Sequence, residues 1–161
     1  INGAIDAVSH LEPYATQCLQ ERAGSSILTD GLDLYGKGYA DCVLAARTPL
    51  LDENPGAVKA VIKAMMVAQL ETEQNTLATL EETVGKYYKT SLESLKLAQS
   101  RQPVMIDQRN NTQFFYDRSV SMQKMGYVKN TLPSDALNWT LLEEVISENQ
   151  ELYNSLELKS A

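Results

Sequence analysis

The sequence predicts an α/β fold in which helix dominates, and three observations lead to this class. Three short apolar runs of strand character lie within residues 4–47, separated by polar or glycine-rich stretches. From residue 54 onward, apolar residues recur at the i, i+3, i+4, i+7 spacing of helices. Hydrophobic residues make up 43% and charged residues 22% of the 161 positions, which are ordinary values for a chain that folds around a core.

The three apolar runs have the length and composition of strands. They are AIDAVS (residues 4–9), SSILTD (25–30) and YADCVLAAR (39–47). The last run is almost continuously apolar in its second half, which is typical of a buried strand. Three strands of this length make a poor sheet without further strands or a covering layer, so we expect this segment to belong to something larger.

Helix and loop are predicted between these strands. Pro13 suits the first turn of a helix because its missing N–H needs no partner there, and Gly24 suits a helix end. A helix is therefore expected over residues 13–24. Residues 30–39 are rich in Gly and Asp and are expected to form a loop.

A long helix is predicted over residues 52–73. Asn54 can cap its first turn, and Pro55 suits the first helical position. We interpret the methionines of this helix as core residues rather than as part of a cofactor site. Its apolar residues follow the helical spacing and predict one stripe that faces a core: Val58, Val61, Ile62, Met65, Met66 and Leu70.

Further helices are predicted over residues 76–85, 90–101, 110–126 and 140–156. Gly85 and Gly126 are expected to end two of them. Thr140 and Glu143 match a T-x-x-E capping box at the start of the last. The residues expected to face the core are Leu92, Leu95, Ala98, Phe115, Met122, Met125, Leu142, Val145, Ile146 and Tyr153.

The net charge of −7 argues against a nucleic-acid or anionic-membrane surface, which needs clustered Lys and Arg. A local site can still oppose the global charge, so an anionic small ligand stays compatible with it. No apolar stretch approaches the roughly 20 residues that a membrane-spanning helix needs. The chain starts at Ile1 and shows no signal peptide, so we expect a mature or truncated chain whose compartment the sequence leaves open.

Cys18 and Cys42 match neither a zinc-site spacing nor a CxxC redox motif. The simplest interpretation is two buried thiols, because a disulfide requires an exported chain and Cα atoms within about 7 Å. No cofactor and no metal site are predicted. Four glutamates lie spread over the polar face of the last helix and are expected to be solvated: Glu143, Glu144, Glu148 and Glu151.

Ser9, His10 and Glu12 end the first strand candidate, and His10 is the only histidine. In a strand, His10 and Glu12 would share a face and Ser9 would point away from them. Catalysis is disfavoured, because a dyad needs a nucleophile or a third orienting group, and no G-x-S-x-G, H-E-x-x-H or phosphate-loop motif occurs. Two interpretations stay open: structural roles, or ligand contact at a strand end, where α/β sheets bind ligands.

Tyr35 and Tyr39 flank the glycine-rich stretch before the third strand candidate. Aromatic side chains beside a flexible crossover can close over a ligand, and they are as often simple packing residues. Tyr39 is therefore a candidate for ligand contact beside Ser9, His10 and Glu12.

Two segments together resemble a known pattern: GAIDAVSHLEPYA (residues 3–15) and YADCVLAARTPLLDENPGAVKAVIKAMMVAQ (39–69). The chain resembles the second half of the nitrate/sulfonate/taurine-type substrate-binding proteins of ABC importers. Their broader family also contains the thiamine-pyrimidine synthases. Leu11 stands where the family often has Trp. The matching positions are Asp6-Ala7, Glu12-Pro13, Val43 to Ala46 and Asn54-Pro55.

The resemblance implies the C-terminal portion of a type 2 periplasmic-binding-protein fold, with the first lobe missing. In such proteins two α/β lobes close on a ligand like a hinged clamp. Residues 1–38 would end the second, ligand-clamping lobe, residues 39–47 would be the hinge crossover strand, and residues 48–161 would be a helical segment that packs on the first lobe. Without that lobe we expect an exposed apolar face and a homo-oligomer or domain-swapped assembly.

The resemblance also implies a function. The chain would be the solute-binding component of an ABC importer and would capture a small anionic or heterocyclic solute by lobe closure. Ser9, His10 and Glu12 would lie at the cleft-facing end of a second-lobe strand, with Tyr39 near the hinge. His10 could donate a hydrogen bond to an oxyanion, whereas Glu12 would repel an anion and is expected to orient His10 or to bind a donor group of the ligand.

The implied partners are the small solute and the permease of the importer. The implied location is periplasmic or extracellular, membrane-associated in the full-length protein. Two alternatives stay open. One is an enzyme of the thiamine-pyrimidine-synthase kind, which the single histidine disfavours, and the other is a ligand-sensing domain of a signalling protein.

Overall fold

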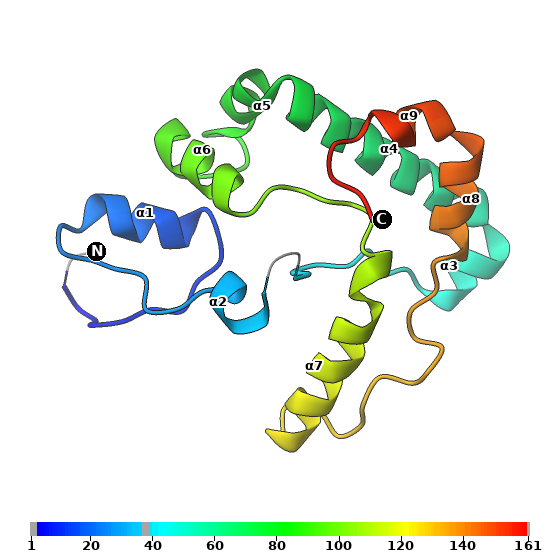
Figure 1. Ribbon diagram of the computed structural model, residues 1–161, viewed down its shortest axis with the longest axis horizontal. Coiled ribbons are helices and arrows are strands. Elements are labelled where there is room, and N and C mark those ends of the chain that lie inside the picture. The colour runs from blue at the N-terminus through cyan, green and yellow to red at the C-terminus, as the bar shows by residue number, and fades with distance from the viewer. Residues whose placement is uncertain (1–2, 37–38, 161) are drawn as a thin grey trace. The chain divides into compact units, whose positions relative to one another are not determined.

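The computed structural model describes residues 3–36 and 39–160 (Figure 1). Within these ranges the regular elements are helices, and the only β-pairing is an isolated bridge between Val84 and Tyr88. The predicted dominance of helix is therefore confirmed, whereas the predicted strands are absent from the described part of the chain.

The chain divides into two compact units, residues 1–30 with 71–104 and residues 31–70 with 105–161. The first unit holds α1 (Tyr14–Glu21), α5 (Thr76–Thr83) and α6 (Leu92–Arg101). Helix α4 (Pro55–Gln74) belongs to the second unit except for residues 71–74. The second unit also holds α2 (Gly31–Tyr35), α3 (Thr48–Glu53), the 3-10 helix η1 (Arg109–Asn111), α7 (Thr112–Lys124), α8 (Thr140–Glu148) and α9 (Gln150–Ser155).

The three strand candidates have irregular backbone and no partner strand in the described part of the chain. The strand prediction was wrong because a strand depends on hydrogen bonds to a neighbouring strand, which the local sequence does not supply. Large apolar side chains in all three segments remain exposed, among them Ile5 at 63%, Leu28 at 87% and Val43 at 52%.

The first unit is built where α6 packs against α1 and α5. Ser91 caps α6, because its hydroxyl accepts a hydrogen bond of 3.0 Å from the N–H of Ser94. The Ser94 hydroxyl in turn donates to the side-chain oxygen of Gln20 on α1. Leu95 and Ala98 are buried, as their spacing predicts. The helix expected over residues 13–24 is confirmed as α1, which is shorter and ends at Glu21.

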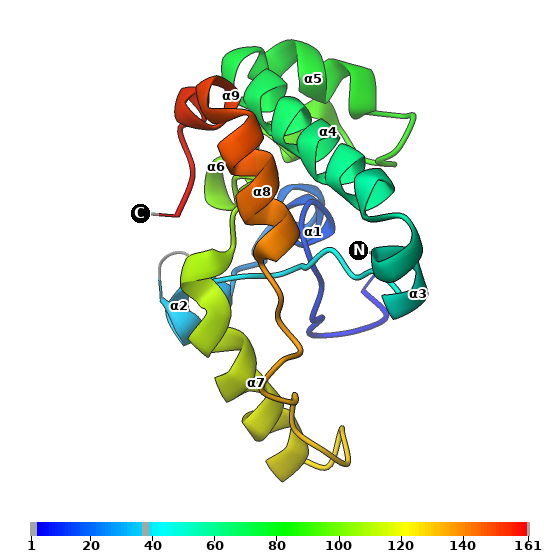
Figure 2. The same ribbon diagram turned by 90° about the vertical axis from the view of Figure 1, so that its right-hand side faces the viewer.

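The core of the second unit forms where α8 lies alongside α4, as both Figure 1 and Figure 2 show. The cap predicted at Asn54 is confirmed, since its Oδ1 accepts a hydrogen bond of 3.2 Å from the N–H of Ala57. The predicted stripe is only partly buried, because Val61 is 48% exposed. The buried cluster consists of Val58, Ile62, Met66, Leu142, Val145 and Leu156.

The single helix predicted over residues 140–156 is interrupted at Asn149, which separates α8 from α9. The Asn149 side chain donates a hydrogen bond of 2.8 Å to the carbonyl of Val145, a local bond of the kind that competes with helix continuation. The predicted capping box is wrong as well. Thr140 is already helical, and its N–H donates to Oδ1 of Asn138 at 2.9 Å.

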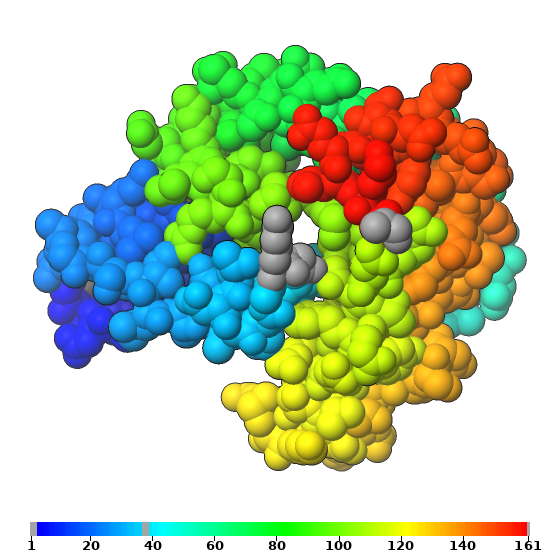
Figure 3. Space-filling model, viewed as in Figure 1, coloured from blue at the N-terminus to red at the C-terminus, as the bar shows by residue number. Residues whose placement is uncertain are grey.

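Residues 30–39 were expected to form a loop, yet residues 31–35 form the short helix α2; residues 37–38 lie outside the described part. Asp33 in its first turn favours the helix, because a carboxylate there opposes the positive end of the helix dipole. Tyr39 packs on Gly31 so closely that a Cβ at position 31 would lie 2.1 Å from its ring. Figure 3 shows the surfaces of α2 (light blue) and α7 (yellow-green) side by side.

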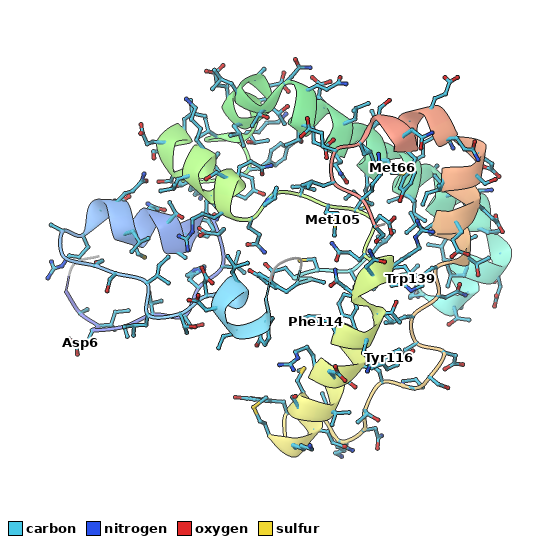
Figure 4. All side chains as sticks on the ribbon, in the orientation of Figure 1. Asp6, Met66, Met105, Phe114, Tyr116 and Trp139 are labelled. Atoms are coloured by element: carbon cyan, nitrogen blue, oxygen red, sulfur yellow. The ribbon has the colours of Figure 1, made fainter. Side chains whose placement is uncertain are left out.

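Helix α7 is tied to the chain that follows it (Figure 4). Tyr116 donates from its hydroxyl to the carbonyl of Ser134 at 2.7 Å, and Trp139 donates from its indole N–H to the hydroxyl of Thr112 at 3.0 Å. Two methionines predicted to face the core are exposed, Met122 at 42% and Met125 at 63%. That prediction was wrong because helical spacing shows which residues share a face, and not whether a neighbour covers it.

Candidate functional site

Ser9 and His10 lie on an exposed segment that leads into α1, and every residue from 3 to 11 is exposed. The imidazole of His10 packs near the ring of Tyr14, with the ring centroids 5.2 Å apart. Its Nδ1 accepts a hydrogen bond of 2.9 Å from the backbone N–H of Leu11. Because Nδ1 is the acceptor, the neutral imidazole carries its proton on Nε2. His10 therefore offers an Nε2–H donor that a ligand oxygen can reach.

Glu12 is the least exposed of the polar residues in this segment, with a side chain 17% exposed. Its Oε2 accepts a hydrogen bond of 3.1 Å from the N–H of Thr16, in the first turn of α1. A carboxylate at this position satisfies one of the N–H groups that a helix start leaves unpaired and opposes the helix dipole. Its Oε1 lies 3.4 Å from Nη1 of Arg101.

Arg101 links Glu12 to a second carboxylate. In the last turn of α6, its Nη2 lies 3.2 Å from Oδ2 of Asp30. The guanidinium thus connects the chain before α1 with the chain after it. Two carboxylates and one guanidinium leave this group with a net charge of −1 when all three are ionised, so it does not attract a small inorganic anion.

Tyr39 belongs to the second unit, whereas Ser9, His10 and Glu12 belong to the first. Its ring lies 6.0 Å from that of Tyr35, centroid to centroid, at an angle of 53°. Tyr35 also makes an edge contact with Phe114 on α7, with centroids 5.4 Å apart. Tyr39 is therefore part of an aromatic cluster that α2 and α7 hold together.

A hollow of about 440 Å³ lies between α4 and the junction of α8 and α9 in the second unit. Lys59 lies at its wall and forms an ion pair of 3.2 Å with Glu144 and a second pair with Glu148. The hydrogen bonds that Lys59 donates to Glu148 and then to Glu144 raise the pKa of Lys59. The charge of Lys59 is therefore already neutralised by two carboxylates. The lining residues are Gly56, Lys59, Ala60, Lys63, Val145, Glu148 and Asn149.

The four glutamates predicted to form a solvated face on the last helix are all exposed: Glu143, Glu144, Glu148 and Glu151. Among the described residues, no three His, Cys, Asp or Glu side chains are grouped so that they could hold a metal ion.

Both cysteines are free thiols. Cys18 is half-buried and Cys42 is exposed, so the expectation of two buried thiols is wrong for Cys42.

Comparison with known protein families shows to which family the chain belongs. The profile of the NMT1-like family, of nitrate/sulfonate/taurine-binding type, matches residues 2–84, which is just over half of the 161 residues. The chain belongs to the NMT1-like family. Comparisons with curated proteins and with solved structures found no match.

The family match covers all four candidate residues of this NMT1-like chain, Ser9, His10, Glu12 and Tyr39. Family membership indicates a solute-binding protein of the ABC-transporter type. Among the residues that the structure describes, no helix is both long and apolar enough to cross a membrane. Arg101 lies outside the matched residues.

Arg101 is the charged residue of this NMT1-like chain that sequence reasoning missed. Its only local signal is a basic residue in the last turn of a predicted helix, which opposes the helix dipole wherever it occurs. The pairing with Asp30 spans 71 residues, and no spacing rule relates residues that far apart. The pairing of Arg101 with Glu12 likewise joins residues far apart in the sequence and arises only in the folded chain.

Proposed function

We propose that this NMT1-like chain is part of a solute-binding protein of an ABC importer and captures a small solute by lobe closure. The family match over residues 2–84 is the observation that carries the proposal. In the proposed arrangement residues 1–38 belong to the ligand-clamping lobe, residues 39–47 form the hinge crossover and residues 48–161 pack on the first lobe. The protein would act in the periplasm or outside the cell, with a membrane-bound permease as its partner.

Ser9 and His10 are the proposed direct contacts on the clamping lobe. Both side chains are exposed, and Nε2–H of His10 is free of the bond that Leu11 makes to Nδ1. A hydroxyl and an imidazole N–H next to each other suit an oxygen or ring-nitrogen acceptor on the ligand. Tyr39 is the proposed aromatic contact near the hinge.

Glu12 completes the proposed site, with a role that its partners define. Oε2 is held by Thr16 and Oε1 by Arg101, so the carboxylate has a fixed position at the start of α1. A fixed carboxylate accepts hydrogen bonds from N–H groups and repels anions. We therefore favour a heterocyclic solute that carries an N–H donor over nitrate, within the two ligand classes that the resemblance implies.

The test is calorimetric titration of the full-length protein with three probes: nitrate, taurine and a pyrimidine that carries an amino group. We expect the pyrimidine to bind most tightly. His10→Ala and Ser9→Ala should each weaken that binding by about tenfold, which corresponds to one lost hydrogen bond.

Ser26→Ala is the matched control, because Ser26 is an exposed serine in the same unit and lies away from His10 in the sequence. It should leave the affinity unchanged. Unchanged affinity in both Ser9→Ala and His10→Ala would refute the site assignment, and a protein that binds none of the probes would refute the proposed ligand class.

A further inference from the structure

The end of α7 and the chain that returns from it form a projection that hydrogen bonds hold together. In Figures 1 and 2 this end of the helix points away from α4 and α8 of the same unit. Three polar side chains, on one face of α7, bond the main chain of the returning segment. Tyr116 donates to the carbonyl of Ser134 at 2.7 Å, Gln123 donates to the carbonyl of Lys129 at 3.0 Å, and Ser119 accepts from the N–H of Leu132 at 3.1 Å. We call residues 118–134 the α7 tip.

The apolar side chains of the α7 tip lie in solvent, while its polar side chains make these internal bonds. Met125 is 63% exposed and Tyr127 is 75% exposed. Met122 lies one turn before Met125 on the same helix face and is also exposed. Exposed apolar groups that are already held in place suit contact with an apolar partner, because binding orders little more of the chain.

The α7 tip carries positive charge in a chain whose net charge is −7. Residues 118–134 contain Arg118, Lys124 and Lys129 and neither Asp nor Glu. Lys124 and Lys129 are exposed, and neither forms an ion pair within the described part of the chain. Charges farther away than about 10 Å are largely screened at an ionic strength of about 0.1 M. The two lysines, rather than the net charge, therefore decide what the tip attracts.

This combination of side chains fits a lipid surface better than a protein surface. Lys is depleted at protein–protein interfaces. At a membrane, in contrast, Lys lays its apolar stem against lipid while its ammonium group stays among the headgroups. Tyr is enriched at the same level, and the flexible side chain of Met adapts to an irregular apolar surrounding.

We propose that the α7 tip docks on the surface of an anionic phospholipid bilayer. Met122, Met125 and Tyr127 enter the boundary between headgroups and acyl chains, and Lys124 and Lys129 contact lipid phosphates. Lys124 follows Met125 around the helix by about 100°, so the tip approaches the bilayer with its end rather than with one helix face. The docking needs neither a solute nor a permease and therefore goes beyond the proposed function.

The probe is a pair of protein-free vesicle preparations, one of phosphatidylcholine and one of phosphatidylcholine with an equal part of phosphatidylglycerol. The full chain is mixed with each and floated on a sucrose gradient, in which protein aggregates stay at the bottom. We expect binding to the anionic vesicles to be at least about fivefold tighter and to weaken as salt is added.

Tyr127→Trp supplies a readout at the tip itself. It keeps an aromatic ring at position 127, and the original chain has one tryptophan, Trp139, which is not part of the tip. Anionic vesicles that contain brominated lipid should quench a larger share of the fluorescence of Tyr127→Trp than of the original chain. Equal quenching of the two proteins would contradict the proposed contact.

Paired variants separate the contributions of charge and apolar contact. Lys124→Gln and Lys129→Gln should each weaken binding to anionic vesicles about fivefold, and Met125→Ser should weaken it about tenfold. Two controls should change nothing: Lys63→Gln, at an exposed lysine of the same unit, and Leu28→Ser, at a leucine of the other unit that is 87% exposed. Far-ultraviolet circular dichroism confirms that each variant keeps its helices.

The proposal is overturned if the chain does not float with anionic vesicles, a result that would leave a protein as the partner of the tip. It is also overturned if Lys124→Gln and Met125→Ser, both folded, bind as the original chain does. A loss of binding in Leu28→Ser equal to that in Met125→Ser would overturn it too, because any exposed apolar residue would then suffice. His10→Ala should float as the original chain does, so a failure of the proposed solute site and a failure of this proposal are distinguishable.

Discussion

The hydroxyl of Tyr153 donates a hydrogen bond of 2.6 Å to Oδ2 of Asp107, a carboxylate that is 2% exposed. Arg109 completes the group with two parallel hydrogen bonds to the same carboxylate, 3.0 Å from Nε and 2.8 Å from Nη2. Ser160 donates from its hydroxyl to the backbone carbonyl of Asp107 at 3.1 Å. These bonds fasten α9 and the chain after it to the segment before α7.

Asp107→Asn is expected to destabilise the chain by about 2 kcal/mol, because it removes the closer counter-charge of the half-buried guanidinium of Arg109 and leaves only Glu143, 3.9 Å away. Tyr153→Phe should cost about 1 kcal/mol, the net value of one hydrogen bond. Urea unfolding measures both. Tyr127→Phe is the control, since Tyr127 is 75% exposed, and it should be neutral. Equal stability of Asp107→Asn and the original chain would contradict this account.

The same carboxylate predicts a pH dependence. Burial raises the pKa of Asp107, but the hydrogen bonds from Arg109 and Tyr153 outweigh it and lower the pKa from 3.8 to about 2. A folded-state pKa below the unfolded value means that this stabilisation is complete above about pH 4 and is lost as the pH falls through about 2. The stability difference between the original chain and Asp107→Asn should therefore shrink by about 2 kcal/mol between pH 5 and pH 2. A constant difference over that range would show that the carboxylate is not held as described.

Met66 is 1% exposed at the centre of the core cluster. Met66→Ala is expected to destabilise the chain by 2–5 kcal/mol, roughly the range for large-to-small substitutions in a packed core. Met125→Ala, at a methionine 63% exposed, should stay within about 0.5 kcal/mol. Thermal unfolding followed by circular dichroism checks both, and similar losses at the two positions would mean that the core is not where the structure places it.

The helix positions that could be predicted from the sequence are those marked by residues next to them in the chain. Asn54 and Pro55 at the start of α4 act through the first turn, and Gly85 and Gly126 adopt the positive φ angles, 75° and 80°, that glycine tolerates after a helix. The buried residues Val58, Ile62 and Met66 followed from their spacing for the same reason.

Features that depend on distant residues could not be predicted. The segment at 39–47 has a strand composition, but a strand also needs a hydrogen-bonding neighbour. Met122 and Met125 have core composition, but nothing on α7 itself tells whether another element covers them. The contacts of Tyr153 with Arg109 and Asp107 span 44 and 46 residues, and those residues carry no shared motif.

The exposed apolar side chains of the strand candidates predict self-association. Ile5 is 63% exposed and Leu28 is 87% exposed, and both lie on irregular backbone in the first unit. Exposed apolar surface of this kind promotes association. Light scattering coupled to gel filtration should give a mass that rises with concentration above that of a monomer, and Ile5→Lys with Leu28→Lys should reduce it, whereas Ser26→Lys should not. A monomer at all concentrations would contradict the prediction.

The ion pair of Arg101 with Glu12 is expected to stabilise the segment that carries Ser9 and His10. Both side chains are partly buried, 26% and 17% exposed, so their coupling should exceed that of a fully exposed pair. A double-mutant cycle of Arg101→Gln and Glu12→Gln, followed by urea unfolding, should give a coupling energy of about 1 kcal/mol. Arg101→Lys should recover only part of it, because an ammonium group is a single point of charge and cannot span Glu12 and Asp30 in the way a guanidinium does.

The control for this cycle is Glu93→Gln paired with Arg101→Gln, since Glu93 lies in the first turn of the same helix and Arg101 in the last. Its coupling energy should be near zero. If the coupling energy of Glu12 and Arg101 is also near zero, the guanidinium does not hold Glu12 in place. Glu12 would then no longer be supported as a fixed carboxylate of the proposed solute site. If they couple as expected, Arg101→Gln should also loosen the start of α1, seen as faster hydrogen exchange at the N–H of Thr16, which donates to Glu12.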